Sequence, residues 1–356
     1  MSLVKTASVS EVNDITTLVA RKDSVTRAMI LPFADFTPLL ADLLRMHHKP
    51  GSRLLSAGHV LPEVELAADR SGVAIEEARG ESPFVGDVQP VLDAIESDKE
   101  LIYIANPNRV TGADFSLDDL KKLAQAVPNG AVIVDEYYHD FYGITAAPLL
   151  EMFPNVIILR SFTAAFGIQS AEAGYVLSNP WVISRMEQEM QGRPISKTVR
   201  RTIMQTIVNQ ELVNRRLHEV HEESLRLATG LSGLGVQSKI TATDFLLMRV
   251  NDPKELGNAL AAEKVYISNL DGYPELDHYV RYRIQSPLSN DKFMDTMKKM
   301  PSRNYKMASI DRRMVRSRRA AEQARPPERT SVLGEAGTAK RPSRFRTEKP
   351  DLIKTS

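Results

Sequence analysis

The hydrophobic positions of this chain follow two alternating patterns. Short continuous apolar runs, typical of buried parallel strands, alternate with longer stretches whose apolar residues recur every three or four positions, as in helices. The predicted strands are 53–58, 73–78, 101–105, 131–136, 155–160 and 173–178, and the helices between them are 37–48, 61–72, 87–97 and 116–127. This alternation predicts βαβ units and therefore a three-layer α/β/α fold with a mostly parallel sheet.

The region after the sixth predicted strand is organised differently. A long helical pattern, about 181–229, precedes a smaller α+β unit. Its strands are predicted at 245–250 and 279–284, and its helices at 253–264 and 289–300. We therefore divide the chain into an N-terminal arm (1–27), a large domain (28–230), a small α+β domain (231–300) and a tail (301–356).

The tail differs from the rest of the chain in charge. Residues 301–356 hold 15 Lys and Arg against 6 Asp and Glu, although the net charge of the whole chain is only +1. Few large apolar residues accompany these charges, so we predict a disordered basic tail. Such a tail can contact nucleic acid, but it lacks regularly spaced aromatic residues, and a solvated extension is the favoured interpretation.

Composition excludes several classes of site. The chain has no cysteine, which excludes disulfides, thiolate metal sites and a cysteine nucleophile. No apolar run approaches the roughly 18 residues of a membrane span, and we see no signal-peptide pattern, so we expect a cytoplasmic protein without membrane contact. His47 and His48 are adjacent, so their rings point to different sides of a helix, and the pair His218–His221 has no third ligand nearby. We therefore expect no metal site.

Polar residues cluster where the predicted strands end. Asn106, Asp135, Tyr138 and Arg160 all follow or terminate an apolar run. In open α/β sheets, ligands bind beyond the carboxyl ends of the strands. We therefore expect these four side chains to surround the functional site.

Four motifs place the chain beside a known family. They are NPNRVTG (106–112), VIVDEYYHDF (132–141), LRSFTAAFG (159–167) with AGY shortly after it, and GYPELDHYVRYRIQSPLSND (272–291). In this order they resemble the fold-type I aminotransferases, which use pyridoxal 5'-phosphate (PLP). The resemblance is strongest to the histidinol-phosphate aminotransferase branch, with threonine-phosphate decarboxylase as a near relative, and it covers roughly three quarters of the chain.

The resemblance implies roles for the residues that match the family pattern. Asp135 would contact the pyridine nitrogen, Tyr138 the ring hydroxyl and Thr163 the phosphate. Arg281 would bind the carboxylate of the substrate, since arginine offers two parallel hydrogen bonds to such a group. Arg283 is an equally placed competitor two residues later. Asp135 and Tyr138 are also explained as a polar pair that satisfies the strand end.

The chain departs from the family at residues that carry the chemistry. Ala164 stands where the family has the lysine that holds the cofactor and moves the proton at the substrate's α-carbon. Arg109 replaces an asparagine that contacts the ring hydroxyl, and Glu172 replaces an arginine of the phosphate site. The turn expected to cradle the phosphate reads PFADFT (32–37) and brings the carboxylate of Asp35 instead.

These changes leave charged residues without their usual partners. Glu172 lies at a position where the family binds a phosphate dianion. Because buried charges need partners, we expect Glu172 to form an ion pair with Arg160 or Arg109.

The departures favour a folded family member that has lost transaminase chemistry, holds no cofactor and acts as a binding or partner subunit. The resemblance implies a dimer, either of two copies or with an active homologue. One alternative is an enzyme that reuses the pocket without PLP, with Arg109, Arg281 and His139 around a small carboxylated or phosphorylated ligand. A second is an active PLP-dependent aminotransferase or amino-phosphate decarboxylase, which needs another lysine, Lys197 being the nearest in sequence.

Overall fold

The computed structural model describes residues 14–166, 172–189 and 195–307 of the 356-residue chain. The chain divides into two compact units, Met1–Ala308 and Ser309–Ser356. The predicted basic tail lies outside the described residues from position 308 onward. In the described ranges, no helix is both long enough and apolar enough to cross a membrane.

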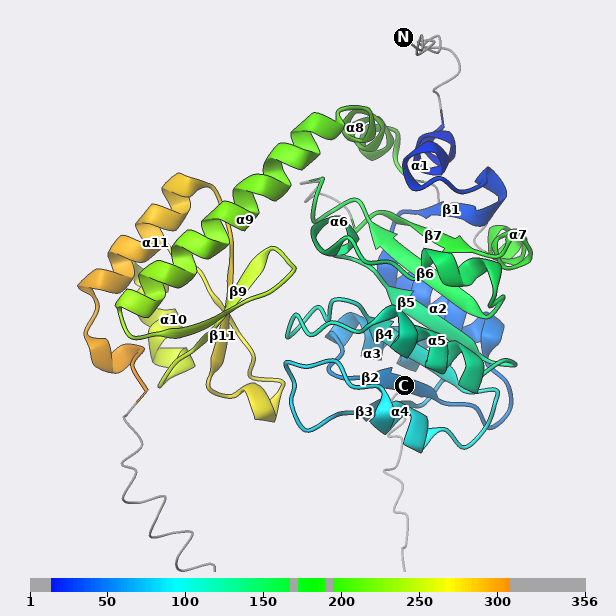
Figure 1. Ribbon diagram of the computed structural model, residues 1–356, viewed down its shortest axis with the longest axis horizontal. Coiled ribbons are helices and arrows are strands. Elements are labelled where there is room, and N and C mark those ends of the chain that lie inside the picture. The colour runs from blue at the N-terminus through cyan, green and yellow to red at the C-terminus, as the bar shows by residue number, and fades with distance from the viewer. Residues whose placement is uncertain (1–13, 167–171, 190–194, 308–356) are drawn as a thin grey trace, which may run out of the picture. The chain divides into compact units, whose positions relative to one another are not determined.

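A seven-stranded sheet forms the centre of the N-terminal part of the first unit (Figure 1). Its strands are β1 (Ile30–Phe33), β2 (Leu54–Ala57), β3 (Ile75–Ala78), β4 (Leu101–Ala105), β5 (Ala131–Asp135), β6 (Val156–Ser161) and β7 (Gly174–Ser178), in the order β1-β7-β6-β5-β4-β2-β3. Strands β3, β2, β4, β5 and β6 pair in parallel, whereas β7 is antiparallel to both β6 and β1. The predicted mostly parallel sheet is confirmed, with its last predicted strand reversed.

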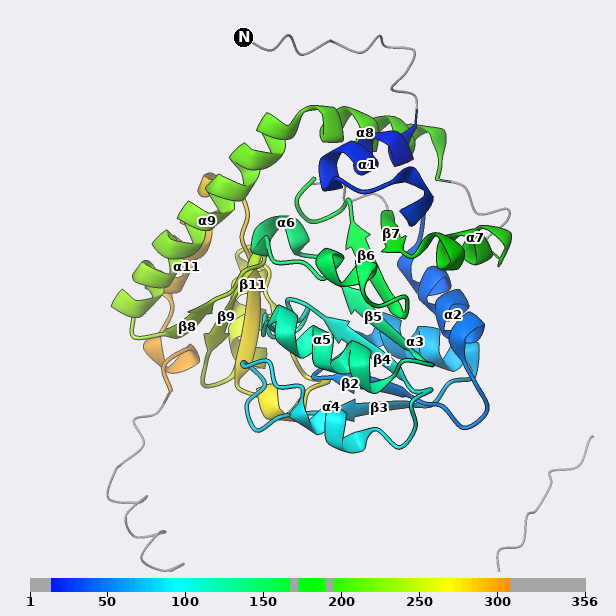
Figure 2. The same cartoon turned by 45° about the vertical axis from the view of Figure 1, so that its right-hand side comes forward.

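Alternate side chains of the central strands enter two separate hydrophobic cores, because successive residues of a strand point to opposite faces. In β4, Ile102 and Ile104 face one core, while Leu101 and Tyr103 face the other. Helices of the first core are α1 (Ile15–Asp23), α4 (Gln89–Ala94), α5 (Leu117–Ala126) and α8 (Lys197–Val208), and those of the second are α2 (Phe36–His47), α3 (Pro62–Ser71) and α7 (Pro180–Glu189). Figure 2 shows α5 on one side of the sheet and α2 and α3 on the other, which confirms the α/β/α layers.

Local sequence signals explain where several helices begin and end. The Ser116 hydroxyl accepts from the Asp119 backbone N–H at 3.1 Å and the Asp119 carboxylate accepts from the Ser116 N–H, a capping box that starts α5. Helix α3 ends at Gly72, whose φ of +72° is a left-handed conformation that glycine adopts without strain.

A four-stranded antiparallel sheet forms the C-terminal part of the first unit. Its strands are β8 (Gln237–Ile240), β9 (Phe245–Arg249), β10 (Ser268–Asn269) and β11 (Tyr279–Arg283), in the order β10-β11-β9-β8. Residues of α9 (Gln210–Gly233), α10 (Pro253–Ala262) and α11 (Pro287–Lys299) complete its core. The remaining short elements are α6 (His139–Tyr142) and the 3₁₀ turns η1 (Arg27–Met29), η2 (Ala147–Glu151), η3 (Pro274–Leu276) and η4 (Ser302–Asn304).

The structure shows three features that the sequence interpretation did not include. The N-terminal arm contains α1, which buries Ile15, Leu18 and Val19 in the first core. The long helical pattern at 181–229 is divided among α7, α8 and α9. The chain also stays packed beyond residue 300, since the Tyr305 side chain is buried in the C-terminal core.

Candidate functional site

The carboxylate of Asp135, at the end of β5, is the centre of the candidate site. Its Oδ2 accepts a hydrogen bond from the Tyr103 hydroxyl at 2.7 Å, and its Oδ1 accepts from the Tyr137 backbone N–H at 3.1 Å. Nη1 of Arg109 lies 3.4 Å from the same Oδ2, which makes a buried ion pair. Both oxygens of the carboxylate that the resemblance assigns to the cofactor ring therefore accept hydrogen bonds from residues of this chain.

The Arg109 guanidinium is held by aromatic rings as well as by charge. Its Cζ lies 4.1 Å from the centre of the Tyr137 ring and 5.4 Å from that of Phe36, and its side chain is 13% exposed. Burial alone disfavours a charge, but the Asp135 carboxylate and the neighbouring tyrosine side chains together outweigh it and raise the pKa of Arg109 above its ordinary value. Arg109 is a permanent cation at this position.

Little space remains around the guanidinium. The Arg109 cavity, as we call it, has a volume of about 20 Å³, which holds about one water molecule. It is lined by Phe33, Phe36, Arg109, Asp135, Tyr137, Leu159, Arg160, Ser161 and Glu172.

The Tyr138 hydroxyl has a hydrogen-bond partner that the sequence analysis did not identify. Its hydroxyl donates to Oδ1 of Asp244 at 3.0 Å, and its ring packs edge-to-face on Phe245. Burial and the Asp244 carboxylate raise the pKa of the Tyr138 phenol well above its ordinary value, so it stays a neutral donor. This hydrogen bond joins the loop after β5 to the start of β9.

Ala164 is buried in an apolar cluster with 1% of its surface exposed. The buried members of the cluster are Val110, Tyr138, Ala164, Phe245, Leu247, Leu270 and Leu276. The preceding Thr163 donates its backbone N–H to the Ser161 hydroxyl at 2.9 Å. The position that the family gives to a lysine is thus part of a hydrophobic contact in this chain.

Carboxylates gather at the end of the site where the resemblance places a phosphate. Asp35 caps α2 and accepts the Thr37 backbone N–H at 3.3 Å, so a carboxylate already lies at this helix N-terminus. Burial, together with the carboxylates of Glu63 and Asp35, raises the pKa of Glu172 against the influence of Arg109. This end of the site therefore presents carboxylates where the resemblance places a phosphate.

The predicted ion pair of Glu172 is wrong. Glu172 forms no salt bridge with a described residue, whereas Arg160 binds Oδ2 of Asp23 and Oε2 of Glu136, each at 2.9 Å. The Tyr175 hydroxyl donates to the same Asp23 oxygen at 2.8 Å. Arg160 therefore ties α1 to the sheet, and its partners come from distant elements that spacing in the sequence could not identify.

Arg281 and Arg283 differ in their partners. Arg283 pairs with Oδ2 of Asp244 at 2.8 Å. Arg281 donates to the Arg109 backbone carbonyl at 2.8 Å and lies over the Phe245 ring, and it forms no salt bridge with a described carboxylate. Of the two arginines considered for binding a substrate carboxylate, Arg281 is therefore the one whose charge is not paired with a described carboxylate.

A larger pocket surrounds this free charge, and we call it the Arg281 pocket. Its volume is about 330 Å³. The lining residues are Leu61, Glu63, Arg109, Tyr137, Tyr138, Asp244, Phe245, Ser268, Arg281 and Arg283. The pocket therefore brings together Arg109, Tyr138 and Arg281 of the predicted site.

Two other candidates lie away from both cavities. His139 lies with its Nδ1 3.6 Å from Oε2 of Glu136, and burial together with Arg160 lowers its pKa. Lys197 begins α8 and is exposed. Among the described residues, no lysine lines the Arg109 cavity or the Arg281 pocket, and no group of three or more potential ligands could hold a metal ion.

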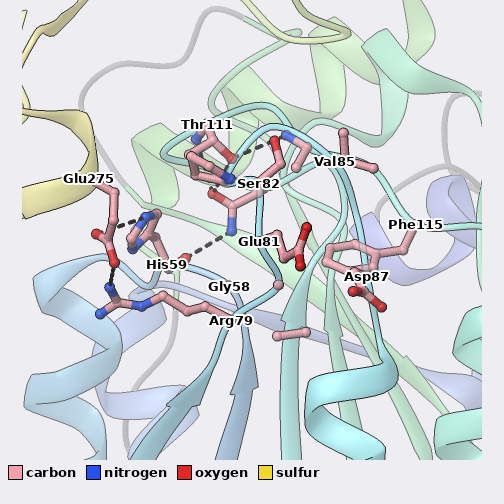
Figure 3. A pocket seen from close by; sticks show the side chains of 15 residues that line it. Gly58, His59, Arg79, Glu81, Ser82, Val85, Asp87, Thr111, Phe115 and Glu275 are labelled. Atoms are coloured by element: carbon pink, nitrogen blue, oxygen red, sulfur yellow. Dashed lines mark hydrogen bonds and ion pairs between the residues drawn. The ribbon is translucent and has the colours of Figure 1, made fainter. Parts of the chain in front are cut away.

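A separate cavity of about 100 Å³ lies beside the loop 106–112 (Figure 3). The buried His59 packs between the loops there, with its Nε2 3.8 Å from Oε2 of Glu275, which also binds Arg79. The Asn108 side chain donates to the His59 carbonyl at 2.8 Å and so fixes the wall shared with the loop. None of the predicted site residues lines this cavity.

Comparison with known proteins identifies the family. The model of the class I and II aminotransferases matches residues 18–292. The chain belongs to the class I and II aminotransferase family. Histidinol-phosphate aminotransferase of Chlorobaculum tepidum is 25% identical over 217 residues, 60% of this chain and 62% of the relative. The match thus spans less than two thirds of the relative's length.

Solved structures of the family share the fold. Histidinol-phosphate aminotransferase from Sinorhizobium meliloti, solved in complex with pyridoxal-5'-phosphate, has a TM-score of 0.74 at 18% identity and matches over 83% of each chain. L-threonine-O-3-phosphate decarboxylase from Porphyromonas gingivalis has a TM-score of 0.68 at 20% identity, over 81% of this chain and 88% of that chain. Neighbours with this fold therefore include both aminotransferases and decarboxylases.

The described residues of this family member do not fit PLP. Asp135 matches the family pattern but is bound by Arg109, and the remaining cavity has the size of about one water. Ala164 offers no amine, and Glu172 with Asp35 replaces a phosphate cradle with negative charge. The residues therefore fail to match three separate parts of the cofactor: its ring, its covalent link to the protein and its phosphate.

Proposed function

We propose that this chain is a family member without transaminase activity that acts as a binding or partner subunit. It forms a dimer, either with a second copy or with an active homologue, and it holds no PLP. The single observation that carries the proposal is the absence of an amine: Ala164 is buried among apolar side chains where the family chemistry requires a lysine.

Transamination by this family needs that amine twice. It binds the cofactor covalently, and it then moves a proton at the substrate's α-carbon. A methyl group does neither. Since no lysine among the described residues lines the two cavities of the site, the structure supports no substitute for it.

Electrostatics support the same proposal at the other end of the site. A phosphate would meet the carboxylates of Glu172, Asp35 and Glu63, and the last two already act on Glu172. Like charges in a partly buried site raise each other's free energy, so cofactor capture would be opposed even if an amine were supplied.

A second candidate function is the binding of a small carboxylated or phosphorylated ligand in the Arg281 pocket. Arg281 is the observation that favours it, because its guanidinium faces about 330 Å³ of space without a carboxylate partner among the described residues. Replacing Arg281 by alanine should abolish ligand-induced thermal stabilisation in a screen of small carboxylates and phosphates. Replacing the paired Arg283 should have a smaller effect.

Purification from the native host tests the partner role. The proposal predicts a stoichiometric complex, either of two copies or of this chain with a lysine-bearing homologue, measured by light scattering after size-exclusion chromatography. A monomer at all concentrations, with no stoichiometric companion, would contradict it.

A further inference from the structure

The Arg109 guanidinium shares several physical features with the protonated pyridine ring of PLP. A guanidinium is a planar, delocalised cation that presents N–H groups in its plane and stacks on aromatic faces. Here it directs Nη1 to Oδ2 of Asp135 and lies over the Tyr137 ring. A protonated pyridine ring bound to the same carboxylate would also be a planar cation with an in-plane N–H.

The loop that carries Arg109 is fixed on both sides. Oδ1 of Asn108 accepts the backbone N–H groups of Val110 and Thr111, each at 3.0 Å. Val110 is buried in the same apolar cluster as Ala164. The Arg109 carbonyl itself accepts from Arg281 at 2.8 Å. The backbone of Arg109 is therefore held in place, and its side chain is held by Asp135 and by the Tyr137 and Phe36 rings.

We propose that Arg109 is a built-in occupant of the place that the family gives to the cofactor ring, and that it excludes the ring independently of the missing lysine. The inference rests on the proposed function, which states that PLP is not held, and it adds which residue prevents entry. Two consequences follow. Supplying a lysine at position 164 leaves the ring excluded, whereas removing the guanidinium opens a site for the ring even without a lysine.

Pyridoxine is the probe that separates these consequences. It has the ring and the ring hydroxyl of the cofactor but neither an aldehyde nor a phosphate. It therefore forms no covalent bond with surface lysines, and it avoids the repulsion by Glu172. Binding to the full-length protein is measured by equilibrium dialysis and by the rise in melting temperature, since a ligand that binds only the folded state stabilises it.

Wild type and Arg109→Ala are compared first. The inference predicts that Arg109→Ala binds pyridoxine at least about tenfold more tightly than wild type. Ala164→Lys serves as the matched control, and its affinity for pyridoxine should equal that of wild type. Because Arg109→Ala leaves the Asp135 carboxylate unpaired, Arg109→Ala/Asp135→Asn is the second variant, which opens the same space without a lone buried charge.

The outcomes are distinct. A gain in pyridoxine binding in either folded Arg109 variant, with none in Ala164→Lys, supports the inference. Equal affinity of wild type and both Arg109 variants, with cooperative unfolding shown by circular dichroism, overturns it, as does tight pyridoxine binding by Ala164→Lys alone. Failure of the proposed function would be seen elsewhere, as a PLP adduct on a lysine of the wild-type protein.

Discussion

Removing the Arg109 side chain should destabilise the fold measurably. The change breaks an ion pair whose two side chains are 13% and 3% exposed, and it leaves the Asp135 carboxylate buried with two neutral donors. Loss of one partner from a buried pair costs about 3–5 kcal/mol of unfolding free energy. The long 3.4 Å contact favours the lower end of that range, while the lost contact with the Tyr137 ring adds about 0.5–2 kcal/mol.

A double-mutant cycle isolates the interaction itself. Urea unfolding of wild type, Arg109→Ala, Asp135→Asn and the double variant, followed by circular dichroism, gives the coupling free energy between the two side chains. We expect about 2–3 kcal/mol of coupling, a value within the range for residues in one buried network. Arg45→Ala is the control, because its pair with Asp42 has an arginine that is 57% exposed and should cost less than about 1 kcal/mol.

The reasoning would be refuted by a coupling below about 0.5 kcal/mol, the level expected for independent sites. Such a value would mean that the guanidinium does not bind Asp135 in solution. The place of the cofactor ring would then be open, and the argument from steric exclusion would fail.

The remaining predictions concern three other positions. Asp23→Asn should lower the unfolding free energy by about 3 kcal/mol near neutral pH. Burial works against the Asp23 charge, but Arg160, Lys22 and the Tyr175 hydroxyl together outweigh it and hold the pKa of Asp23 below its ordinary value. The deficit should therefore shrink as pH falls below about 4 in urea titrations. Ala164→Lys should cost about 3 kcal/mol in the same assay, because it places a larger, charged side chain in the apolar cluster. Glu172→Arg combined with Arg109→Ala should make pyridoxine 5'-phosphate bind more tightly than pyridoxine in equilibrium dialysis, and an unchanged order would show that Glu172 does not repel the phosphate.

The sequence was a sufficient guide where local patterns decide the structure. The apolar run at 101–105 coincides with β4, because a strand buried on both faces has no polar positions to obscure its limits. Ser116 begins α5 as predicted, since a cap is a contact between near neighbours. Strand β1 was missed because it has four residues, includes Pro32 and lies at the sheet edge.

The site was less predictable because its contacts join distant elements. The sequence singled out Arg109 and Asp135 separately, but their ion pair depends on how the loop after β4 folds over the end of β5. Glu172 was assigned a partner from the need for charge balance alone. Arg160 pairs with Asp23 instead. Asp23 lies in α1, a helix that the sequence analysis did not predict.

One measurement tests the central claim, loss of PLP chemistry, most directly. The purified wild-type protein is titrated with PLP and followed by absorbance, and it is then treated with borohydride and analysed by mass spectrometry, with urea-unfolded protein as the control for surface lysines. The account predicts no saturable absorbance change and no adduct beyond that control. A stoichiometric adduct on one lysine of the folded protein would contradict it, because it would show that the cofactor-binding amine has moved elsewhere in the chain.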